Sequence, residues 1–502
     1  MKRRIFLKLS GGAALAGATS PGSFRSTTRA ETVEAVTKHA PAVVNTYNGG
    51  EHRQRLENIA ICERGLRKCL RKHLITNYLA GQCCYNLGEY PCRKVWDPDD
   101  WDERELDKLK EHGISLVQVH EDWSDSQRLF GADKYSPLNP AGFRRFVEMV
   151  HRRGMKLIVY ASSGFFDRRD PDFRKEWARD QDLIEIYYHY ARCSPASPGW
   201  RAYLLPHLVK IMDEYGVDGL YDDLGYVPLA GNPQPPTSDE VMAFKESDRD
   251  EGALGDLLGI IYAEVKRRGG IFKVHYSGAS RPCTELTVYD YLWVGEGGRN
   301  LNTLRKAVKN HPPYVVPCPD MSRAKIENED ELFLQSIPYM QFPLLLAGRP
   351  FTGERALIPG IQYQPEAKDF WTGHCRAIWK YYQANPDGPY SYGWWDSVPG
   401  RLEARPTHAR WLKQYLPMVE EGTWTWLEIS ESDFFPRPLP DNVVASAFAN
   451  RELYLVLANY GHEAVEVETS EAYSLAAGSL EGKRQWRLKA RSLQILRRSA
   501  RA

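Results

Sequence analysis

The sequence lacks an excess of charge of either sign. Its 502 residues contain 66 Lys and Arg against 65 Asp and Glu. A protein that holds nucleic acid or an anionic membrane surface carries a field of positive charge for that purpose. The balance therefore argues against both functions, and we expect no nucleic-acid partner.

Metal and nucleotide motifs are also missing. The chain has no C-x-x-C pair and no H-E-x-x-H, which are common spacings of zinc ligands. It has no Walker motif and no G-x-G-x-x-G after an apolar run, so we expect neither phosphate nor dinucleotide chemistry, no metal and no cofactor. Nine cysteines, an odd number, permit disulfides outside the cytoplasm but leave at least one thiol without an intramolecular partner. Their pairing stays open.

No segment approaches the length of a membrane-spanning helix. The chain begins with MKRRIFLKLSGGAALAGATS, in which Arg3 and Arg4 precede a short run rich in Gly and Ala. This order resembles a twin-arginine export signal. We therefore expect a signal peptide over residues 1–30, the twin-arginine export machinery as a partner, and a periplasmic or secreted protein that does not contact the membrane after export.

From about residue 74 the chain alternates helical and apolar segments. A helical pattern closed by glycine, as in DERELDKLKEHG, precedes a short buried run, and such units predict parallel strands with crossover helices. Eight strand candidates follow one another: HLITNYLAGQ, ISLVQVHEDW, MKLIVYASSGFF, VDGLYDDLGY, IFKVHYSGA, YDYLWVGEG, YVVPCPDM and FPLLLAGRPF. Eight such strands predict a (β/α)8 TIM barrel over residues 74–422. An open doubly wound sheet usually has a glycine-rich first turn, which is absent.

The sequence pattern is different before and after this region. After residue 422, short alternating segments such as ELYLVLANYG and RSLQILRR predict a small antiparallel, β-sandwich-like domain over residues 423–502. Residues 31–73 are expected to form a helical or irregular segment. The C-terminal domain shows no catalytic cluster, so we expect it to cover one side of the barrel, with carbohydrate binding as the alternative. Fourteen Trp and 28 Tyr would suit stacking on sugar rings, or a large core.

Polar residues directly follow the predicted strands. Because the carboxyl ends of barrel strands share one face, these residues should form the rim of a polar pocket. They are Glu121, Asp122, Trp123, Ser162, Ser163, Asp222, Asp223, His275, Tyr276, Glu296 and Asp320. We expect Tyr160, on the third strand, to line the same cavity.

Two carboxyl groups that flank one bond can hydrolyse a glycoside. In GLYDDLG the alternation of a strand places Leu220 and Asp222 on one face and Asp223 on the other. We expect Asp222 to be the nucleophile and Glu296, between glycines, to be the acid/base. Two alternatives stay open: Asp223 caps the following turn, and Glu296 pairs with a neighbouring arginine.

The strand-end motifs VHEDW, LIVYASSG, GVDGLYDDLGY, VGEGG, CPDM and FPLLLAGRP resemble the barrel of the clan D glycoside hydrolases, the α-galactosidase group. The resemblance covers about residues 75 to 420. It implies that Asp222 is the nucleophile, that Glu296 is the acid/base, and that the sugar is bound by Glu121, Asp122, Trp123 and Asp320. The group carries a Lys two residues before the nucleophile and usually an Asp as acid/base, whereas this chain has Leu220 and Glu296.

These observations predict an exported retaining glycoside hydrolase that acts on an α-linked oligo- or polysaccharide. A non-catalytic carbohydrate-binding protein on a barrel scaffold is one alternative. A glycosidase of another clan that uses Glu121 or Glu354 is a second. Four arginines in predicted loops offer contacts for an anionic sugar: Arg281, Arg299, Arg349 and Arg355.

Overall fold

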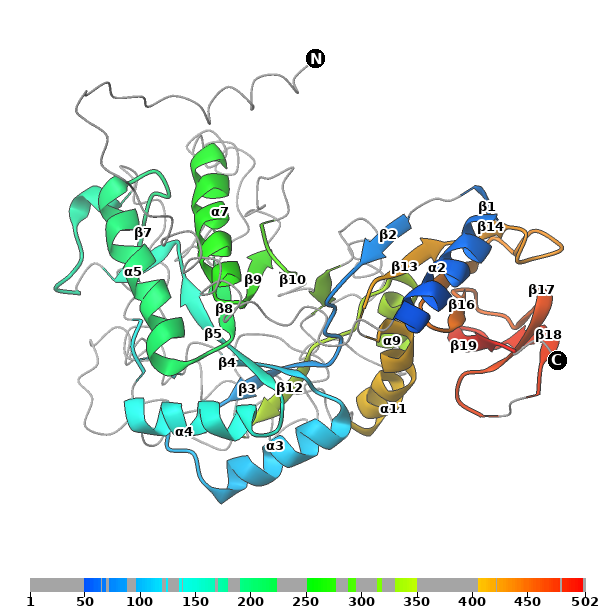
Figure 1. Cartoon of the computed structure of the whole chain (residues 1–502), viewed down its shortest axis with the longest axis horizontal. Helices are drawn as coiled ribbons and strands as arrows, with labels where there is room; N and C mark the ends of the chain where they lie inside the picture. Colours follow the sequence, from blue (N-terminus) through cyan, green and yellow to red (C-terminus); the bar gives the residue numbers. More distant parts are fainter. Residues whose placement is uncertain are drawn as a thin grey trace, which may run out of the picture.

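The protein is described from a computed structural model. The described residues are 49–64, 66–68, 72–87, 96–119, 123–124, 135–137, 139–167, 170–178, 190–223, 251–276, 288–294, 314–317, 330–349, 405–420, 422–478 and 481–499. They form a barrel and a β-sheet domain that lie side by side (Figure 1). Within them, no helix combines the length and the apolar character needed to cross a membrane.

Eight parallel strands form the barrel and follow one another around it in chain order. They are β3 (Gln82–Asn86), β4 (Leu116–Val119), β5 (Lys156–Ser162), β8 (Gly219–Asp223), β9 (Ile271–Tyr276), β10 (Tyr291–Val294), β11 (Val315–Pro317) and β12 (Leu345–Gly348). The last strand pairs with the first, β12 with β3. The amide of Leu344 donates to the carbonyl of Pro317 at 3.1 Å, which joins the start of β12 to β11. The predicted (β/α)8 barrel is confirmed.

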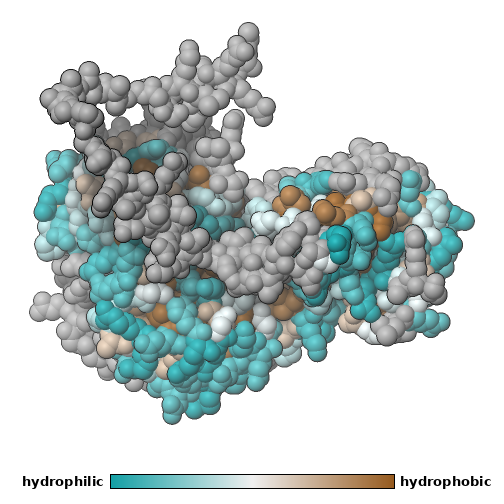
Figure 2. Space-filling model, viewed as in Figure 1, coloured by the Kyte–Doolittle hydropathy of each residue, from teal (hydrophilic) through white to brown (hydrophobic). Residues whose placement is uncertain are grey.

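Crossover helices lie outside these strands (Figure 1). They are α3 (Asp100–His112), α4 (Pro140–His151), α5 (Pro198–Tyr215), α7 (Glu251–Arg267) and α9 (Asp330–Ser336). The limits of α3 follow from its sequence: Asp99 caps its first turn, and Gly113 ends it at φ +97°, a left-handed conformation that favours glycine. The outer surface formed by α3 and α4 is mainly hydrophilic (Figure 2), as expected for helices that bury one face.

The first barrel strand differs from its prediction. We expected it within HLITNYLAGQ, residues 73–82, but the strand is β3, which begins at the last residue of that segment. The earlier part of the expected strand is β2 (Lys72–Ile75), which pairs with the C-terminal sheet instead. Both segments form short strands, and only the pairing partners separate them. The four cysteines in the described part of the chain, Cys62, Cys83, Cys84 and Cys193, are all buried.

The second part is an antiparallel sheet, as predicted. Its strands run in the order β18-β17-β19-β16-β15-β13-β2. They are β13 (Trp424–Glu428), β15 (Val443–Ala449), β16 (Leu453–Asn459), β17 (Val465–Leu475), β18 (Lys483–Leu488) and β19 (Ser492–Arg498), with β2 at one edge. Helix α2 (Gly49–Arg64) packs against β13 and β15. Residues 49–75, which precede β3, therefore contribute a strand to the C-terminal sheet and a helix that packs against it.

Shorter elements complete the described chain. They are β1 (Leu66–Lys68), which pairs with β14 (Glu431–Ser432), β6 (Phe165–Asp167), which pairs with β7 (Tyr190–Arg192), helix α11 (Arg405–Tyr415), and the 3-10 turns η4 (Lys175–Trp177), η5 (Ile337–Tyr339) and η7 (Leu416–Val419).

The barrel and the sheet share one apolar core. The ring of Tyr415, on α11, lies 5.1 Å from that of Phe342 and 5.9 Å from that of Phe448, on β15. The hydroxyl of Tyr460 donates to the carbonyl of Leu334, on α9, at 2.9 Å. Because aromatic packing and a buried hydrogen bond cross the boundary, the sheet holds the side of the barrel that carries α9.

Candidate functional site

The candidate site begins at β8, the fourth barrel strand. Gly219 starts this strand at φ +149°, and a Cβ built there would lie 1.9 Å from the carbonyl oxygen of Ile271 on β9. Only glycine fits this close approach. The strand then ends in Asp222 and Asp223, where the carboxyl ends of parallel barrel strands meet.

The two faces of β8 are distinguished by contacts that cross the barrel. The Lys273 ammonium, on β9, donates to Gln82 Oε1 at 3.1 Å, although β9 and β3 are separated by three strands. Such a contact is possible only through the lumen, so Lys273 lies on the inner face. Tyr221 is its register partner on β8 and therefore points the same way.

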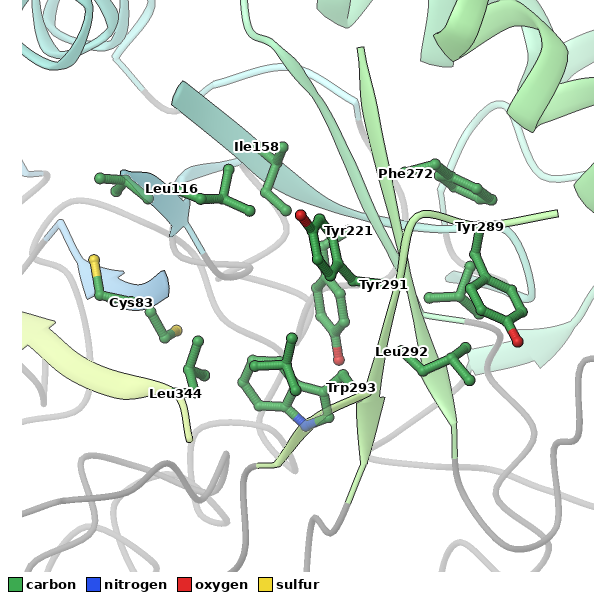
Figure 3. Close-up of a cluster of buried hydrophobic side chains, with 14 of the residues drawn as sticks. Cys83, Leu116, Ile158, Tyr221, Phe272, Tyr289, Tyr291, Leu292, Trp293 and Leu344 are labelled. Carbon is green, nitrogen blue, oxygen red and sulfur yellow. The ribbon is translucent and has the colours of Figure 1, made fainter. Parts of the chain in front are cut away.

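Ring contacts agree with this assignment. The Tyr221 ring lies 5.1 Å from that of Trp293, two strands away, and 5.9 Å from that of Tyr160. Figure 3 shows Tyr221, Tyr291 and Trp293 together inside the barrel, with Phe272 on the other side of the strands. Asp223 shares the inner face with Tyr221, because residues two apart in a strand point to one side.

Asp223 is held from both neighbouring strands. The Tyr160 hydroxyl, on β5, donates to Asp223 Oδ2 at 2.9 Å. His275 Nδ1, on β9, lies 3.4 Å from Asp223 Oδ1. The Asp223 side chain is 23% exposed, so it reaches solvent while both of its oxygens have partners. A carboxylate so placed can contact a molecule that enters the end of the lumen.

Asp222 has the opposite environment. It is 2% exposed, and Ser163 binds both of its oxygens: the amide donates to Oδ1 at 2.9 Å and the hydroxyl to Oδ2 at 2.8 Å. Burial, together with the nearby charge of Asp223, raises the pKa of Asp222 to about 7, although the two hydrogen bonds from Ser163 act to lower this pKa. The alternation predicted for GLYDDLG is confirmed, but the face that Asp222 occupies is the outer one.

Trp123 requires a correction. We expected its ring to be open for stacking on a sugar, but Trp123 is 1% exposed. Its Nε1 donates to the carbonyl of Tyr160 at 2.8 Å, and its ring packs 5.2 Å from that of Phe143 on α4. Trp123 is therefore a core residue between a barrel strand and helix α4. The position of an aromatic residue directly after a strand does not determine whether its ring faces the lumen or the helices.

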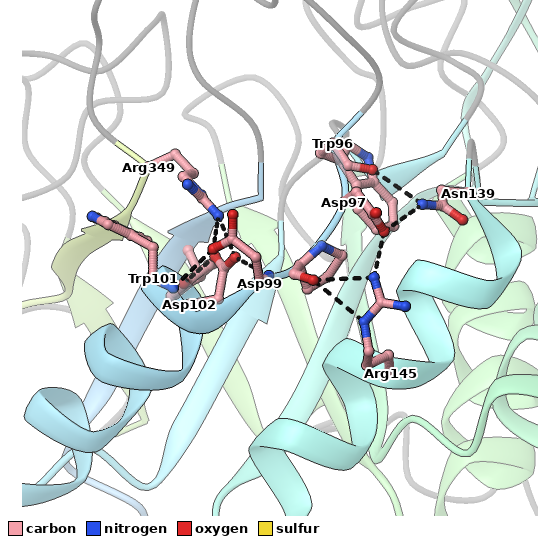
Figure 4. A network of polar contacts seen from close by, with 10 residues as sticks. Trp96, Asp97, Asp99, Trp101, Asp102, Asn139, Arg145 and Arg349 are labelled. Atoms are coloured by element: carbon pink, nitrogen blue, oxygen red, sulfur yellow. Dashed lines mark hydrogen bonds and ion pairs between the residues drawn. The ribbon is translucent and has the colours of Figure 1, made fainter.

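Arg349 forms ion pairs with two aspartates of the protein itself (Figure 4). Its guanidinium lies 2.5 Å from Asp102 Oδ2 and 2.8 Å from Asp99 Oδ1, and 4.6 Å from the centre of the Trp101 ring. This network joins the end of β12 to the start of α3. Arg349 therefore stabilises the seam between the last and first strands, and it is not available for an anionic sugar.

Several expected site residues lie outside the described part of the chain. They are Glu121, Asp122, Glu296, Asp320, Glu354, Arg281, Arg299 and Arg355. The backbone of Tyr276 is described in β9, but its side chain is not. The structure brings Tyr160, Asp223 and His275 together, and the expected roles of the undescribed residues remain predictions.

Four polar residues of the lumen, among those that the structure describes, were not predicted from the sequence. They are Gln82 and Asn86 on β3, Gln118 on β4 and Lys273 on β9, each at most 2% exposed and on the inner face of its strand. A signal was present for Gln118 and Lys273, because each stands between apolar residues of a parallel strand. They form a polar layer within the barrel wall that carries Asp223 and His275.

The fold is similar to known structures. An isomaltulose synthase from Klebsiella sp. LX3 matches with a TM-score of 0.51 and 12% identity, over 84% of this chain and 98% of that chain. A variant of the GH36 alpha-galactosidase from Geobacillus stearothermophilus, in complex with raffinose, matches with a TM-score of 0.50 and 11% identity, over 84% of this chain and 55% of that chain. The chain shares with them the fold of a (β/α)8 barrel and an antiparallel β domain. No protein-family model and no curated protein sequence matches it.

Proposed function

We propose that this chain is a retaining glycoside hydrolase that acts on an α-linked oligo- or polysaccharide. The observation that carries the proposal is the carboxylate of Asp223, which lies on the lumen face at the end of the fourth barrel strand and is held by Tyr160 and His275. Function in a barrel collects at this end of the strands. The likeness of the fold to an isomaltulose synthase and a GH36 alpha-galactosidase supports the same class.

A retaining mechanism needs one ionised carboxylate as nucleophile and one protonated carboxyl as acid/base, about 5 to 5.5 Å apart. Our sequence prediction gave the nucleophile role to Asp222. The geometry favours Asp223, because a buried carboxyl with a pKa near 7 on the outer face is neither reliably ionised nor accessible. Glu296 remains the proposed acid/base, and Glu121, Asp122, Tyr276 and Asp320 remain proposed sugar contacts.

The sequence resemblance to the α-galactosidase group supports an α-linked glycoside but not galactose itself. Neither aspartate has a Lys two residues before it, since Leu220 and Tyr221 occupy those positions. A panel of aryl α- and β-glycosides that includes uronides would identify the sugar and the linkage.

The two aspartates can be separated with isosteric variants. We expect Asp223→Asn to lower kcat on every substrate of the panel by about a thousandfold or more, since loss of a covalent nucleophile usually costs at least that much. Asp222→Asn can keep both contacts with Ser163 and should keep most of the activity. The reverse result would return the role of nucleophile to Asp222.

The acid/base role needs its own test. Glu296→Ala should still react with an activated aryl glycoside, whose leaving group needs no proton, and should nearly stop on a natural glycoside. Added azide should partly restore turnover and yield a product that keeps the anomeric configuration. Equal losses on good and poor leaving groups would refute the role.

Two alternatives are outcomes of the same experiments. Sugar binding without turnover in the wild-type protein would indicate a carbohydrate-binding protein. Full activity in both aspartate variants would indicate a glycosidase with other carboxylates, with Glu121 and Glu354 to be replaced next.

We also propose export through the twin-arginine pathway, on the order of residues in KRRIFLKLS. Replacement of Arg3 and Arg4 together by Lys should retain the protein in the cytoplasm, and fractionation of cells would measure this. An unchanged distribution would remove the proposal.

A further inference from the structure

Three strands converge on the carboxylate of Asp223. Tyr160 approaches one oxygen from β5 and His275 approaches the other from β9, on the two sides of β8. The distances are 2.9 Å from the Tyr160 hydroxyl to Oδ2 and 3.4 Å from His275 Nδ1 to Oδ1. The plane of the carboxylate is therefore defined by two partners rather than by one.

The backbone of Asp223 is fixed as well. Its carbonyl oxygen accepts a hydrogen bond from the Ser162 hydroxyl at 2.9 Å and another from the Ser163 amide at 3.2 Å. The strand end is thus tied to β5 up to its last residue. Only the side-chain torsions of Asp223 remain free, and Tyr160 and His275 restrict these.

The His275 ring is itself held in place. Its side chain is 13% exposed, and its ring lies 6.3 Å from the ring of Tyr221 at an angle of 31°. The described titratable groups on the lumen side with it are Asp223 and Tyr221 on β8, Tyr160 on β5, and Lys273, two residues earlier on the same face of β9. Asp222 lies on the other face of β8, but the charge of His275 still acts on it. The contact between His275 and Asp223 is within ion-pair distance.

We propose that His275 is a positioning residue that keeps Asp223 ionised and fixes its orientation, with Tyr160 as the second support. The inference rests on the proposed function for its catalytic meaning, but the coupling between His275 and Asp223 does not depend on any reaction. An imidazolium or an Nδ1–H group favours the charged form of a carboxylate, and so does a phenol that donates to it. A nucleophile must be ionised and aimed to attack a sugar carbon.

The coupling can be measured without substrate. In the full-length protein carrying ¹³C-labelled histidine, the His275 signal is assigned by its loss in His275→Gln. We expect the midpoint of its titration to fall by about one pH unit in Asp223→Asn, because the neighbouring anion is removed. The signal of His462, which is exposed on the C-terminal domain, should titrate identically in both proteins. An unchanged midpoint for His275 would overturn the proposal.

A kinetic experiment tests the same coupling through the ionisation of Asp223 instead of His275. Gln can donate a hydrogen bond but carries no charge. His275→Gln should therefore move the acidic limb of the kcat/KM profile upward by about one pH unit. The value of kcat/KM on the plateau should fall by much less than in Asp223→Asn. Tyr160→Phe should move that limb in the same direction. A purely structural role would lower the plateau and leave the limb in place, and that result would also overturn the proposal.

The two experiments fail in different ways. If the wild-type protein hydrolyses no glycoside but the His275 midpoint falls in Asp223→Asn, the coupling stands and the proposed function is wrong. If the protein is active and the midpoint does not move, the function stands and His275 has another role. His462→Gln is the matched control for both, and it should leave the kinetic profile unchanged.

Discussion

Asp222 and Asp223 are neighbours in the sequence but occupy opposite sides of the barrel wall. A strand turns successive side chains to opposite faces, so one carboxyl is buried against Ser163 and the other reaches the lumen. Burial raises the pKa of Asp222 to about 7. At the scale of single residues, the surroundings of a carboxyl decide its chemistry.

The first prediction concerns Asp222. In the unfolded chain its carboxyl has a pKa near 3.8, and burial raises the pKa to about 7 in the folded protein. The folded state therefore binds the proton more tightly, and the contribution of Asp222 to stability falls as the pH rises from about 4 to 7, by an amount on the order of 4 kcal/mol. Asp222→Asn should remove this loss. Urea unfolding at pH 5 and pH 8 would measure it, and parallel changes in both proteins would contradict it.

Asp218 provides a control of opposite sign. Burial acts to raise its pKa, but hydrogen bonds from His151, Lys156 and the Leu157 amide hold the pKa below its usual value. Asp218 therefore stabilises the fold at neutral pH, and this contribution is lost as the pH falls through its folded pKa. Asp218→Asn should be destabilised at pH 8, where Asp222→Asn gains stability relative to the wild type.

The second prediction concerns the polar layer of the lumen. Gln118 is fully buried, and neither atom of its side-chain amide has a hydrogen-bond partner among the described residues. Gln82 differs, because its oxygen accepts from Lys273. Gln118→Leu should raise the free energy of unfolding by about 1 to 3 kcal/mol, the cost of an unsatisfied buried polar group, whereas Gln82→Leu should lower it. Chemical denaturation would test the pair, and a loss in Gln118→Leu would show that its amide is satisfied.

At the scale of secondary-structure elements, α3 and α11 meet through two histidines. His112 Nε2 lies 2.7 Å from His408 Nδ1, and His408 Nε2 lies 3.1 Å from the carbonyl of Pro343. Burial, and then the charge of Arg405, lowers the pKa of His112 to about 4. Burial, and then the charge of His112, lowers the pKa of His408 to about 3. Both rings are therefore neutral in the folded protein at neutral pH.

The third prediction follows from this pair. Unfolded histidine takes up a proton below pH 6.5, so stability should fall as the pH drops from about 6.5 to 4, by about 1.4 kcal/mol per pH unit for each histidine that stays neutral. His408→Leu should be less stable at pH 7.5 but should lose less on acidification. Thermal unfolding at pH 4.5 and pH 7.5 would measure both effects. His462→Leu, at an exposed position, should keep the wild-type pH dependence, and the same dependence in His408→Leu would contradict the prediction.

At the scale of the whole molecule, residues 49–75 pack with the C-terminal sheet domain although they precede the barrel in the sequence. β2 pairs with β13, and the His73 ring stacks on Trp426 at 5.7 Å. On α2, Arg55 and Asn58 both donate to Asn450, at 2.8 and 2.7 Å. The barrel is therefore inserted between two segments of one sheet domain.

The fourth prediction tests this arrangement. A chain that begins at residue 76 lacks α2 and β2, so the edge of β13 is left without its partner strand. Relative to a chain that begins at residue 49, we expect a loss of a few kcal/mol, a Tm lower by about 5 °C or more, and concentration-dependent aggregation. Addition of a peptide of residues 49–75 should restore part of the Tm. Equal Tm values for the two chains would contradict the prediction.

The sequence by itself determined the barrel, because eight buried runs separated by helical segments repeat in order, and glycines such as Gly113 mark where helices end. It also determined the alternation at Asp222 and Asp223, because the period of a strand is a local property. It did not determine which of two segments, β2 or β3, joins the barrel.

Only the tertiary structure decided which face of the barrel wall each side chain occupies. Whether Asp222 or Asp223 faces the lumen depends on where the strand sits between helices and barrel interior, and the contact of Lys273 with Gln82 reveals this. The same holds for Trp123, which looked like a sugar platform and is packed on Phe143. A pattern of residues fixes which side chains share a face, but the neighbours brought by long-range packing fix what that face meets.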